Sequence, residues 1–343
     1  NKLSNESNLE PLERANIANQ KFGKIGESEV VTPEKVATEM INLLPDEFLN
    51  KCIENKEPIL DIASKEGEFA IALYKRFKAL GYNLEDYKDL IYSIPTSNIT
   101  YEFTRKIYEL LGLNISNIAK NFNSYDLLKI KCGNEIDHDK IKKILNQKKQ
   151  FNEITLQDVV QIGGDEIVVK FGAVVGNPPY QEDDGGAQKS AKPIYHHFVR
   201  MSKILGEKYS TLIIPARWYA GGKGLDDFRE EMINDKTIQQ LDDFLHPEEV
   251  FPDTSNRGGV CYFLRNSSYN NEINNVKVVS HYNANNISSA YRKMKTRNLD
   301  IFIRDQKSID ILDKVFIDEK LITMEEYISP RKPFGIESNI INT

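Results

Sequence analysis

The residues of this sequence best suited to chemistry stand in one run, Val174-Val175-Gly176-Asn177-Pro178-Pro179-Tyr180. An apolar strand here delivers an asparagine, two prolines and a tyrosine at its carboxyl end, which is the edge where open α/β sheets bind ligands. The prolines fix φ and lack N–H groups, so the carbonyls around them are rigid and have no donor within the loop. The Asn177 side-chain oxygen and the Pro178 carbonyl, held together, would accept both hydrogens of a planar NH2 group.

Such a pair of acceptors solves a specific chemical problem. An aryl amine is a poor nucleophile because its lone pair is delocalised into the ring. Two well-placed acceptors localise that lone pair and stabilise the positive charge that develops on the nitrogen as it reacts. Tyr180 can stack on the ring and hold the nitrogen in line. The alternative interpretation is a proline-rich turn with a buried tyrosine. The run predicts a site that activates an exocyclic amino nitrogen.

The elements that must position this run alternate between strands and helices. Apolar runs predict strands at 58–63, 90–94 and 173–176, and apolar residues at helical spacing predict helices at 69–80 and 101–111. This βαβ succession is typical of a parallel sheet. The later elements are expected to be a strand, a helix and a pair of strands, at 211–214, 225–233, 240–245 and 260–264.

The composition is that of an ordinary globular chain, with 40% hydrophobic and 28% charged residues among 343. The net charge of −6 excludes a surface that is basic throughout, so a nucleic-acid site would have to be local. No apolar run approaches membrane-spanning length, so no membrane partner is expected. Cys52, Cys132 and Cys261 lack metal-ligand spacing, and the chain begins without a signal-peptide pattern. We therefore expect a cytoplasmic protein with no metal site.

From about Lys21 to Val279, the sequence resembles the gamma-class adenine-N6 DNA methyltransferases, particularly the Eco57I-like enzymes of type II restriction-modification systems. The Asn177-Pro178-Pro179-Tyr180 run carries this resemblance most clearly. It implies an α/β fold with a doubly wound, seven-stranded Rossmann-like methyltransferase sheet. It also implies transfer of a methyl group from S-adenosyl-L-methionine to the N6 amino group of adenine in DNA, as the modification part of a restriction-modification system.

The resemblance places the cofactor on three segments of the chain. The first is the start of a helix predicted over 32–44, with Thr32 as N-cap and Pro33 at the first helical position. The second, from Asp61 to Phe69, stands where the family has Asp-Pro-Ala-Cys-Gly-Ser-Gly-x-Phe, and the third contains an acid that accepts from the cofactor's adenine amino group. The implied cofactor residues are Thr32, Pro33, Asp61, Ala63, Gly67, Phe69 and Asp126.

Some of these residues also have plain structural interpretations, and the chain departs from the family pattern in two places. Thr32-Pro33 suits any helix start, and Asp126 suits a surface cap or turn. Lys65 and Glu66 replace a glycine and a serine in the loop. The second strand ends without the family's ribose-binding acid, for which Thr96 or Ser97 is only a partial substitute.

The resemblance further implies that Tyr180 and Phe251 stack on opposite faces of a flipped target adenine, which would offset the cost of extruding the base. The alternative for Phe251 is an ordinary core phenylalanine. His196 and His197 lack nearby ligand partners in the sequence and are interpreted as packing residues. No general base is assigned, because the N6 proton becomes acidic only after methyl transfer.

The domain organisation follows from the resemblance and the charge pattern. Residues 1–285 are expected to form the catalytic methyltransferase domain, with an N-terminal helical part over 1–50 and a charged, lysine-rich insertion over 130–166 that contains one helix. Residues 286–343 are expected to be a linker or the beginning of a truncated target recognition domain.

The expected partner is double-stranded DNA with a flipped adenine, and a fused or separate endonuclease and recognition domain. Two alternatives remain open at this level. The same loop suits a methyltransferase that acts on protein glutamine or on RNA. The altered first loop also suits a cofactor-deficient, methyltransferase-like DNA-binding subunit.

Overall fold

The computed structural model describes residues 10–15, 30–147, 149–157, 169–182, 192–252, 258–283, 285–297 and 299–315. The chain divides into two compact units between Phe302 and Ile303. The first unit contains the sheet and all the residues considered for the site. It continues past residue 285, where the sequence analysis ended the catalytic domain. The described part of the second unit includes one helix, α12 (Gln306–Val315).

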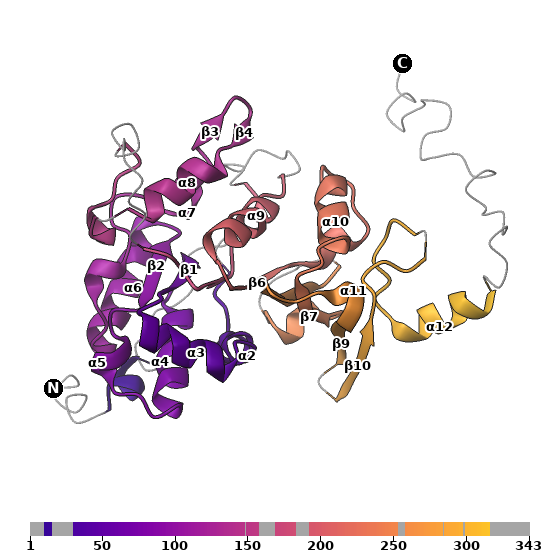
Figure 1. Ribbon diagram of the computed structural model, residues 1–343, viewed down its shortest axis with the longest axis horizontal. Coiled ribbons are helices and arrows are strands. Elements are labelled where there is room, and N and C mark those ends of the chain that lie inside the picture. Colours follow the sequence, from indigo (N-terminus) through magenta and orange to yellow (C-terminus); the bar gives the residue numbers. More distant parts are fainter. Residues whose placement is uncertain are drawn as a thin grey trace, which may run out of the picture. The chain divides into compact units, whose positions relative to one another are not determined.

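The first unit is built on one sheet with the strand order β10-β9-β7-β8-β6-β5-β1-β2 (Figure 1). Strand β1 pairs in parallel with β2 and β5, and β5 pairs in parallel with β6. Strand β8 runs antiparallel between β6 and β7, whereas β9 is parallel to β7 and antiparallel to β10. The strands are β1 (Ile59–Ser64), β2 (Ile91–Pro95), β5 (Ala173–Gly176), β6 (Tyr209–Pro215), β7 (Ile238–Phe244), β8 (Val260–Asn266), β9 (Val276–Asn283) and β10 (Asn286–Arg292).

The doubly wound α/β fold expected from the sequence is confirmed, although the sheet has eight strands among the described residues rather than seven. Near β2, Ile118 contributes a single parallel bridge to Ser93 instead of a full strand. At the other edge β9 and β10 extend the sheet. The side chains of β10 are mostly exposed, so its sequence lacks the apolar alternation that marks a half-buried strand.

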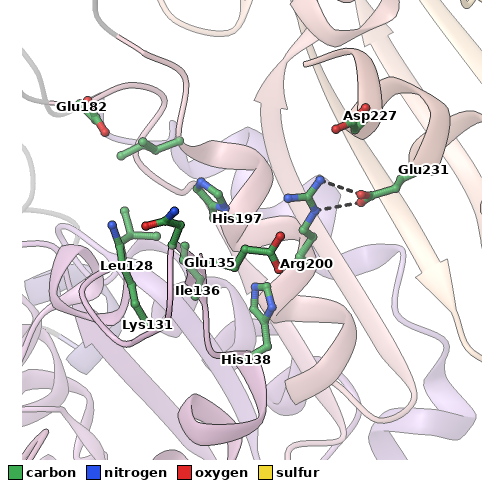
Figure 2. A pocket seen from close by; sticks show the side chains of 12 residues that line it. Leu128, Lys131, Glu135, Ile136, His138, Glu182, His197, Arg200, Asp227 and Glu231 are labelled. Atoms are coloured by element: carbon green, nitrogen blue, oxygen red, sulfur yellow. Dashed lines mark hydrogen bonds and ion pairs between the residues drawn. The ribbon is translucent and has the colours of Figure 1, made fainter. Parts of the chain in front are cut away.

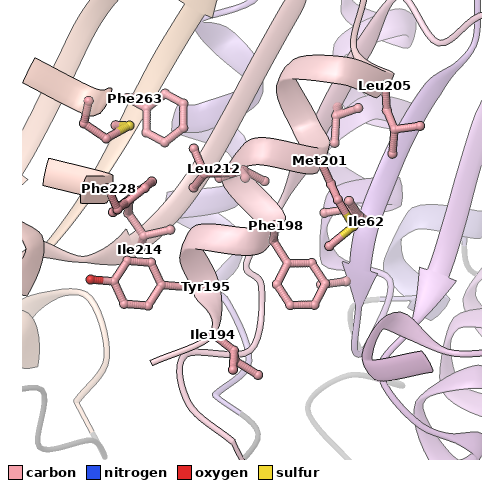
Figure 3. Close-up of a cluster of buried hydrophobic side chains, with 14 of the residues drawn as sticks. Ile62, Ile194, Tyr195, Phe198, Met201, Leu205, Leu212, Ile214, Phe228 and Phe263 are labelled. Carbon is pink, nitrogen blue, oxygen red and sulfur yellow. The ribbon is translucent and has the colours of Figure 1, made fainter. Parts of the chain in front are cut away.

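Both faces of the sheet are covered, and β5 shows how. Ala173 and Val175 belong to a buried cluster with helices α2, α3, α4 and α6, whereas Val174 belongs to a second cluster with α8, α9 and α10. Figure 3 shows part of the second cluster, including Ile62, Phe198 and Leu212. The helices on the first face are α2 (Glu34–Asn42), α3 (Asp46–Asn55), α4 (Glu68–Ala79) and α6 (Asn98–Leu111); those on the second are α8 (His138–Leu145), α9 (Tyr195–Leu205) and α10 (Asp226–Ile233).

The lysine-rich segment predicted as an insertion contains the expected helix, α8, in its described part. A two-stranded sheet precedes it. Within this segment, residues 148 and 158–166 lie outside the described residues. Among the helices that the structure describes, none is long and apolar enough to cross a membrane. The remaining short elements are β3 (Lys131–Cys132), β4 (Glu135–Ile136), α5 (Leu84–Tyr87), α7 (Ser124–Leu127) and α11 (Asn271–Asn274).

Candidate active site

The Asn-Pro-Pro-Tyr run follows β5 directly, at the carboxyl edge of the parallel part of the sheet. Gly176, the last residue of β5, has φ +152°. A Cβ at this position would lie 3.3 Å from both Asp61 Oδ1 and Ile62 Cγ2. Glycine therefore lets the end of β5 approach the end of β1 closely, and this approach brings Asn177 beside the loop that follows β1.

Asn177 is fully buried, and its amide has a defined orientation. Its Nδ2 donates a hydrogen bond to the main-chain oxygen of Val30 at 2.9 Å. Its Oδ1 has no hydrogen-bond partner among the described residues. A buried amide oxygen without a partner is costly, so it marks a position where a donor group of a ligand can bind.

The loop after β1 contains the residues that match the family pattern. Gly67 has φ +73° and caps helix α4, so the chain turns sharply from the loop into the helix. Asp61 is fully buried, and its Oδ1 accepts a hydrogen bond from the Ala63 N–H at 3.2 Å. Burial and then the charge of Glu68 raise the pKa of Asp61 well above its usual value. Its Oδ2 has no hydrogen-bond partner in the described part of the chain. Ala63 and Phe69 are buried in the core and shape the loop from beneath.

Lys65 and Glu66, which replace a glycine and a serine of the family loop, are also buried. Lys65 Nζ donates hydrogen bonds to the main-chain oxygens of Val30, at 2.6 Å, and Asn177, at 3.0 Å. Burial and the charge of Glu68 raise the pKa of Glu66 to about 7. Sequence reasoning therefore located the departures but not their contacts, which join segments far apart in the chain.

Glu68 is a site residue that sequence reasoning missed. Its Oε2 accepts from the Glu66 N–H at 2.9 Å, and its Oε1 accepts from the Thr32 N–H at 3.4 Å. The carboxylate thus binds the segment before α2 to the loop after β1. The sequence did contain a signal for Glu68, since it follows Gly67 at the start of a predicted helix. The helix dipole favours a negative charge in the first turn.

The prediction of Thr32 as N-cap and Pro33 as first helical residue was wrong by one position. Pro33 has extended angles, φ −56° and ψ 141°, and is itself the N-cap of α2. Its carbonyl accepts from the Ala37 N–H. Thr32 is buried one residue earlier, and its Oγ1 has no partner among the residues that the structure describes.

Asp126 lies in α7 and acts there as a capping residue. One carboxylate oxygen accepts from the Asn123 N–H at 3.0 Å, and the other pairs with Lys129 at 2.7 Å. The neighbouring Ser124 Oγ lies 2.8 Å from the Ile62 carbonyl oxygen of β1. Helix α7 is therefore anchored at the end of β1, and Asp126 makes the capping contact that its structural interpretation predicts.

At the end of β2 the polar side chains serve the local structure. Ser97 caps α6 by accepting from the Thr100 N–H, and the hydroxyl of Thr96 lies 3.2 Å from that of Thr100. Ser93 pairs with the hydroxyl of Tyr108 at 2.8 Å. This strand end is polar and carries no acid.

Tyr180 and Phe251 belong to different core clusters. Tyr180 packs against the α9 face, with its ring edge-on to Tyr195 at a centroid distance of 6.5 Å. Its hydroxyl is buried without a partner among the described residues, and burial raises its pKa well above the usual value. Phe251 is 2% exposed and packs in the cluster of α2 and α4. The structure therefore does not place the two rings opposite one another.

A cavity of about 520 Å³ lies between the β3–β4 hairpin, α9 and α10 (Figure 2), and its lining does not include Asn177, Pro178, Pro179 or Tyr180. Arg200 and Glu231 form a bidentate ion pair at its wall. Burial lowers the pKa of His196 to about 4 and that of His197 to about 3, with the charge of Arg200 adding to both. Both histidines are therefore neutral at pH 7. Within the described ranges, no cluster of three or more His, Cys, Asp or Glu residues suits a metal ion.

A family model and a curated protein match this sequence. A sequence model described as Eco57I restriction-modification methylase matches residues 60–251, more than half of the chain. A Mycoplasma pneumoniae protein described as an uncharacterized adenine-specific methylase is 33% identical over 105 residues, which are 30% of this chain and 25% of that protein. The chain thus spans about a quarter of the length of this curated relative.

Solved structures of restriction-modification proteins also match this chain, at low sequence identity. A nuclease-deletion mutant of the Type ISP restriction-modification enzyme LlaGI, in complex with a DNA substrate mimic, matches with a TM-score of 0.50 and 14% identity, over 83% of this chain and 25% of that one. The methyltransferase subunit of a type I restriction-modification system from Streptococcus thermophilus matches with a TM-score of 0.48 and 13% identity, over 88% and 56%. The sequence match over residues 60–251 spans β1, the loop after it and the Asn-Pro-Pro-Tyr run, and on this ground the chain belongs to the Eco57I restriction-modification methylase family.

Proposed function

We propose that this chain is the catalytic part of an S-adenosyl-L-methionine-dependent methyltransferase that modifies the N6 amino group of adenine in double-stranded DNA. Family membership supports the reaction class. The observation that carries the proposal is the Asn177 side chain, which is fully buried, oriented through its Nδ2 and left with a free Oδ1 beside the prolines.

The chemistry follows from that orientation. With its Nδ2 bound to Val30, the Asn177 amide keeps its Oδ1 as the acceptor for the hydrogens of an incoming amino group. Asn177 Oδ1 and the Pro178 carbonyl would accept the two N6 hydrogens, localise the nitrogen lone pair and stabilise the developing positive charge. Pro179 keeps the loop rigid, and Tyr180 provides the aromatic surface for the base. The methylated nitrogen then loses a proton to water, so no side-chain base is required.

The polar groups of the first loop fit the cofactor. S-adenosyl-L-methionine, when bound, supplies an electrophilic methyl group on a positively charged sulfur. Thr32 Oγ1 and Asp61 Oδ2 are buried without partners among the described residues, and the raised pKa values of Asp61 and Glu66 reflect buried carboxyl groups that a cationic ligand would stabilise as carboxylates. We assign the cofactor to Thr32, Pro33, Asp61, Ala63, Gly67, Phe69 and Asp126.

Duplex DNA is the proposed substrate, with adenine flipped into the site. The LlaGI enzyme, which shares the fold, was solved with a DNA substrate mimic, and the curated relative is described as adenine-specific. Stacking on Tyr180 and Phe251 would offset the unstacking cost, and Phe251 must leave its core position to do so. We assign sequence recognition and DNA cleavage to a fused or separate domain. The chain spans about a quarter of each of these two proteins.

The test is incorporation of labelled methyl groups into adenine-containing duplex DNA, followed by chromatography of the nucleosides. Asn177→Ala should abolish N6-methyladenine formation and leave cofactor binding nearly unchanged. Asn121→Ala is a control, because Asn121 bonds to the Asn152 and Ile154 carbonyls away from the loop. Loss of cofactor binding in Asn177→Ala would show that the role assigned to Asn177 is wrong.

A second candidate, a methyltransferase-like DNA-binding subunit without cofactor, is favoured by one observation. Lys65 stands where the family has a glycine, and it is buried against Asn177. Calorimetric titration with S-adenosyl-L-methionine separates the candidates, since this subunit would release no heat at any cofactor concentration.

A further inference from the structure

The ammonium group of Lys65 lies where three segments of the chain meet. It extends from the loop after β1 and donates to Val30, in the segment before α2, at 2.6 Å and to Asn177, after β5, at 3.0 Å. Both acceptors are main-chain oxygens. The side chain is 3% exposed, which is rare for lysine and requires that its charge be stabilised by the protein.

Three acidic residues stand close to Lys65 in the sequence, and the charge of Lys65 acts on one of them, Asp61. Asp61, Glu66 and Glu68 are buried in the same loop and helix start. Glu68 also binds the Thr32 N–H. The segment 30–32 is therefore held against the loop by Lys65 and Glu68, and against β5 by the Asn177 amide.

A glycine at position 65 would leave open the volume that the lysine side chain fills. The segments that Lys65 joins are those to which the proposed function assigns the cofactor and the target base. A positively charged ligand that enters between these segments would meet the ammonium group of Lys65. Like charges repel strongly in a buried site, so the ligand and Lys65 would compete for the same place.

We propose that Lys65 is an internal cation that holds the site closed and competes with the positively charged cofactor, so that Lys65 must move before S-adenosyl-L-methionine binds. This inference rests on the proposed function. It makes Lys65 a residue that discriminates between the charged sulfonium cofactor and its neutral thioether product, S-adenosylhomocysteine, which has otherwise nearly the same shape.

The test is calorimetric titration of the 343-residue chain with both compounds. The wild-type chain should bind S-adenosylhomocysteine at least tenfold more tightly than S-adenosyl-L-methionine. Lys65→Met removes the charge and keeps an unbranched side chain only one atom shorter. It should therefore tighten binding of S-adenosyl-L-methionine at least tenfold and narrow the ratio of the two affinities. Lys65→Arg keeps the charge and should keep the wild-type ratio of the two affinities. Lys78→Met, on an exposed position of α4, is the matched control and should behave as wild type.

Each outcome decides the matter. Weaker binding of both compounds to Lys65→Met would overturn the proposal and make Lys65 a positioning residue for Asn177. If Lys65→Met does not fold, the wild-type affinities for the two compounds decide. Nearly equal affinities would overturn the proposal. If wild type binds the cofactor as tightly as Lys65→Met does, the competition is absent while the proposed function stands. If no variant binds either compound, the cofactor assignment fails and the competition fails with it.

Discussion

The side-chain nitrogen of Asn177 donates to the main-chain oxygen of Val30, 147 residues earlier in the chain. This bond leaves the amide oxygen of the buried Asn177 as the end without a partner among the described residues. It also couples the catalytic loop to the segment before α2, which Lys65 contacts at the same Val30 oxygen and Glu68 contacts at the Thr32 N–H. The orientation of the proposed catalytic group therefore depends on residues outside its own loop.

Asn177→Asp tests that orientation. The carboxylate of this variant retains an acceptor for the N6 hydrogens but cannot donate to Val30. Its second oxygen would instead be repelled by the main-chain oxygen of Val30. We expect a single-turnover methylation rate about tenfold below wild type, corresponding to about 1.4 kcal/mol, and well above that of Asn177→Ala. An Asp variant as slow as the Ala variant would show that the amide acts through its nitrogen.

Glu66→Gln should change the pH dependence of stability. The pKa of Glu66 is about 7 in the folded chain against 4.5 for an ordinary glutamate, so the folded state holds this proton more tightly. The free energy of unfolding therefore falls as pH rises from about 4.5 to 7. Above pH 7 the folded state bears the full penalty of ionising the buried Glu66 carboxyl group. Glutamine removes the penalty.

We expect Glu66→Gln to be more stable than wild type by about 2 kcal/mol at pH 8 and equal to it near pH 4, measured by urea unfolding. Glu54→Gln, at an exposed position of α3, serves as the control. A constant difference between Glu66→Gln and wild type across this range would contradict the shifted pKa.

Gly176→Ala should damage both folding and catalysis. The new Cβ would lie 3.3 Å from Asp61 Oδ1 and Ile62 Cγ2, in a backbone conformation with positive φ. We expect a loss of about 2 to 3 kcal/mol in urea unfolding, together with a lower methylation rate in the folded fraction. Gly81→Ala has positive φ but nothing within 4 Å of its Cβ, so it should cost only about 1 kcal/mol. Equal losses for the two variants would mean that the approach of β5 to β1 is not tight.

Phe251→Leu separates stacking from packing. Leucine keeps most of the apolar volume, so the stability loss should stay near 1 kcal/mol. A leucine cannot stack on a base, so the methylation rate at saturating cofactor should fall about tenfold. Phe228→Leu, in the cluster on the other face of the sheet, should lose similar stability but retain the rate. A normal rate in Phe251→Leu would assign Phe251 to the core alone.

The sequence by itself determined the central features of this protein. Strand β5 has the predicted bounds, because an apolar run closed by Gly176 and two prolines has few other conformations. The βαβ unit and the antiparallel pair β7–β8 are also confirmed, since their signals are local periodicities. The loop pattern of Asp61, Gly67 and Phe69 could likewise be recognised from neighbouring residues.

Only the tertiary structure decided what the loop residues contact. The partners of Lys65 are 35 and 112 residues away, and Glu68 contacts Thr32 at a separation of 36. No periodicity or motif encodes such pairings, because they arise from the order of strands in the sheet and from the burial that follows. Burial likewise decided that Phe251 lies in the core in this conformation, on the opposite face of the sheet from the cluster that Tyr180 contacts.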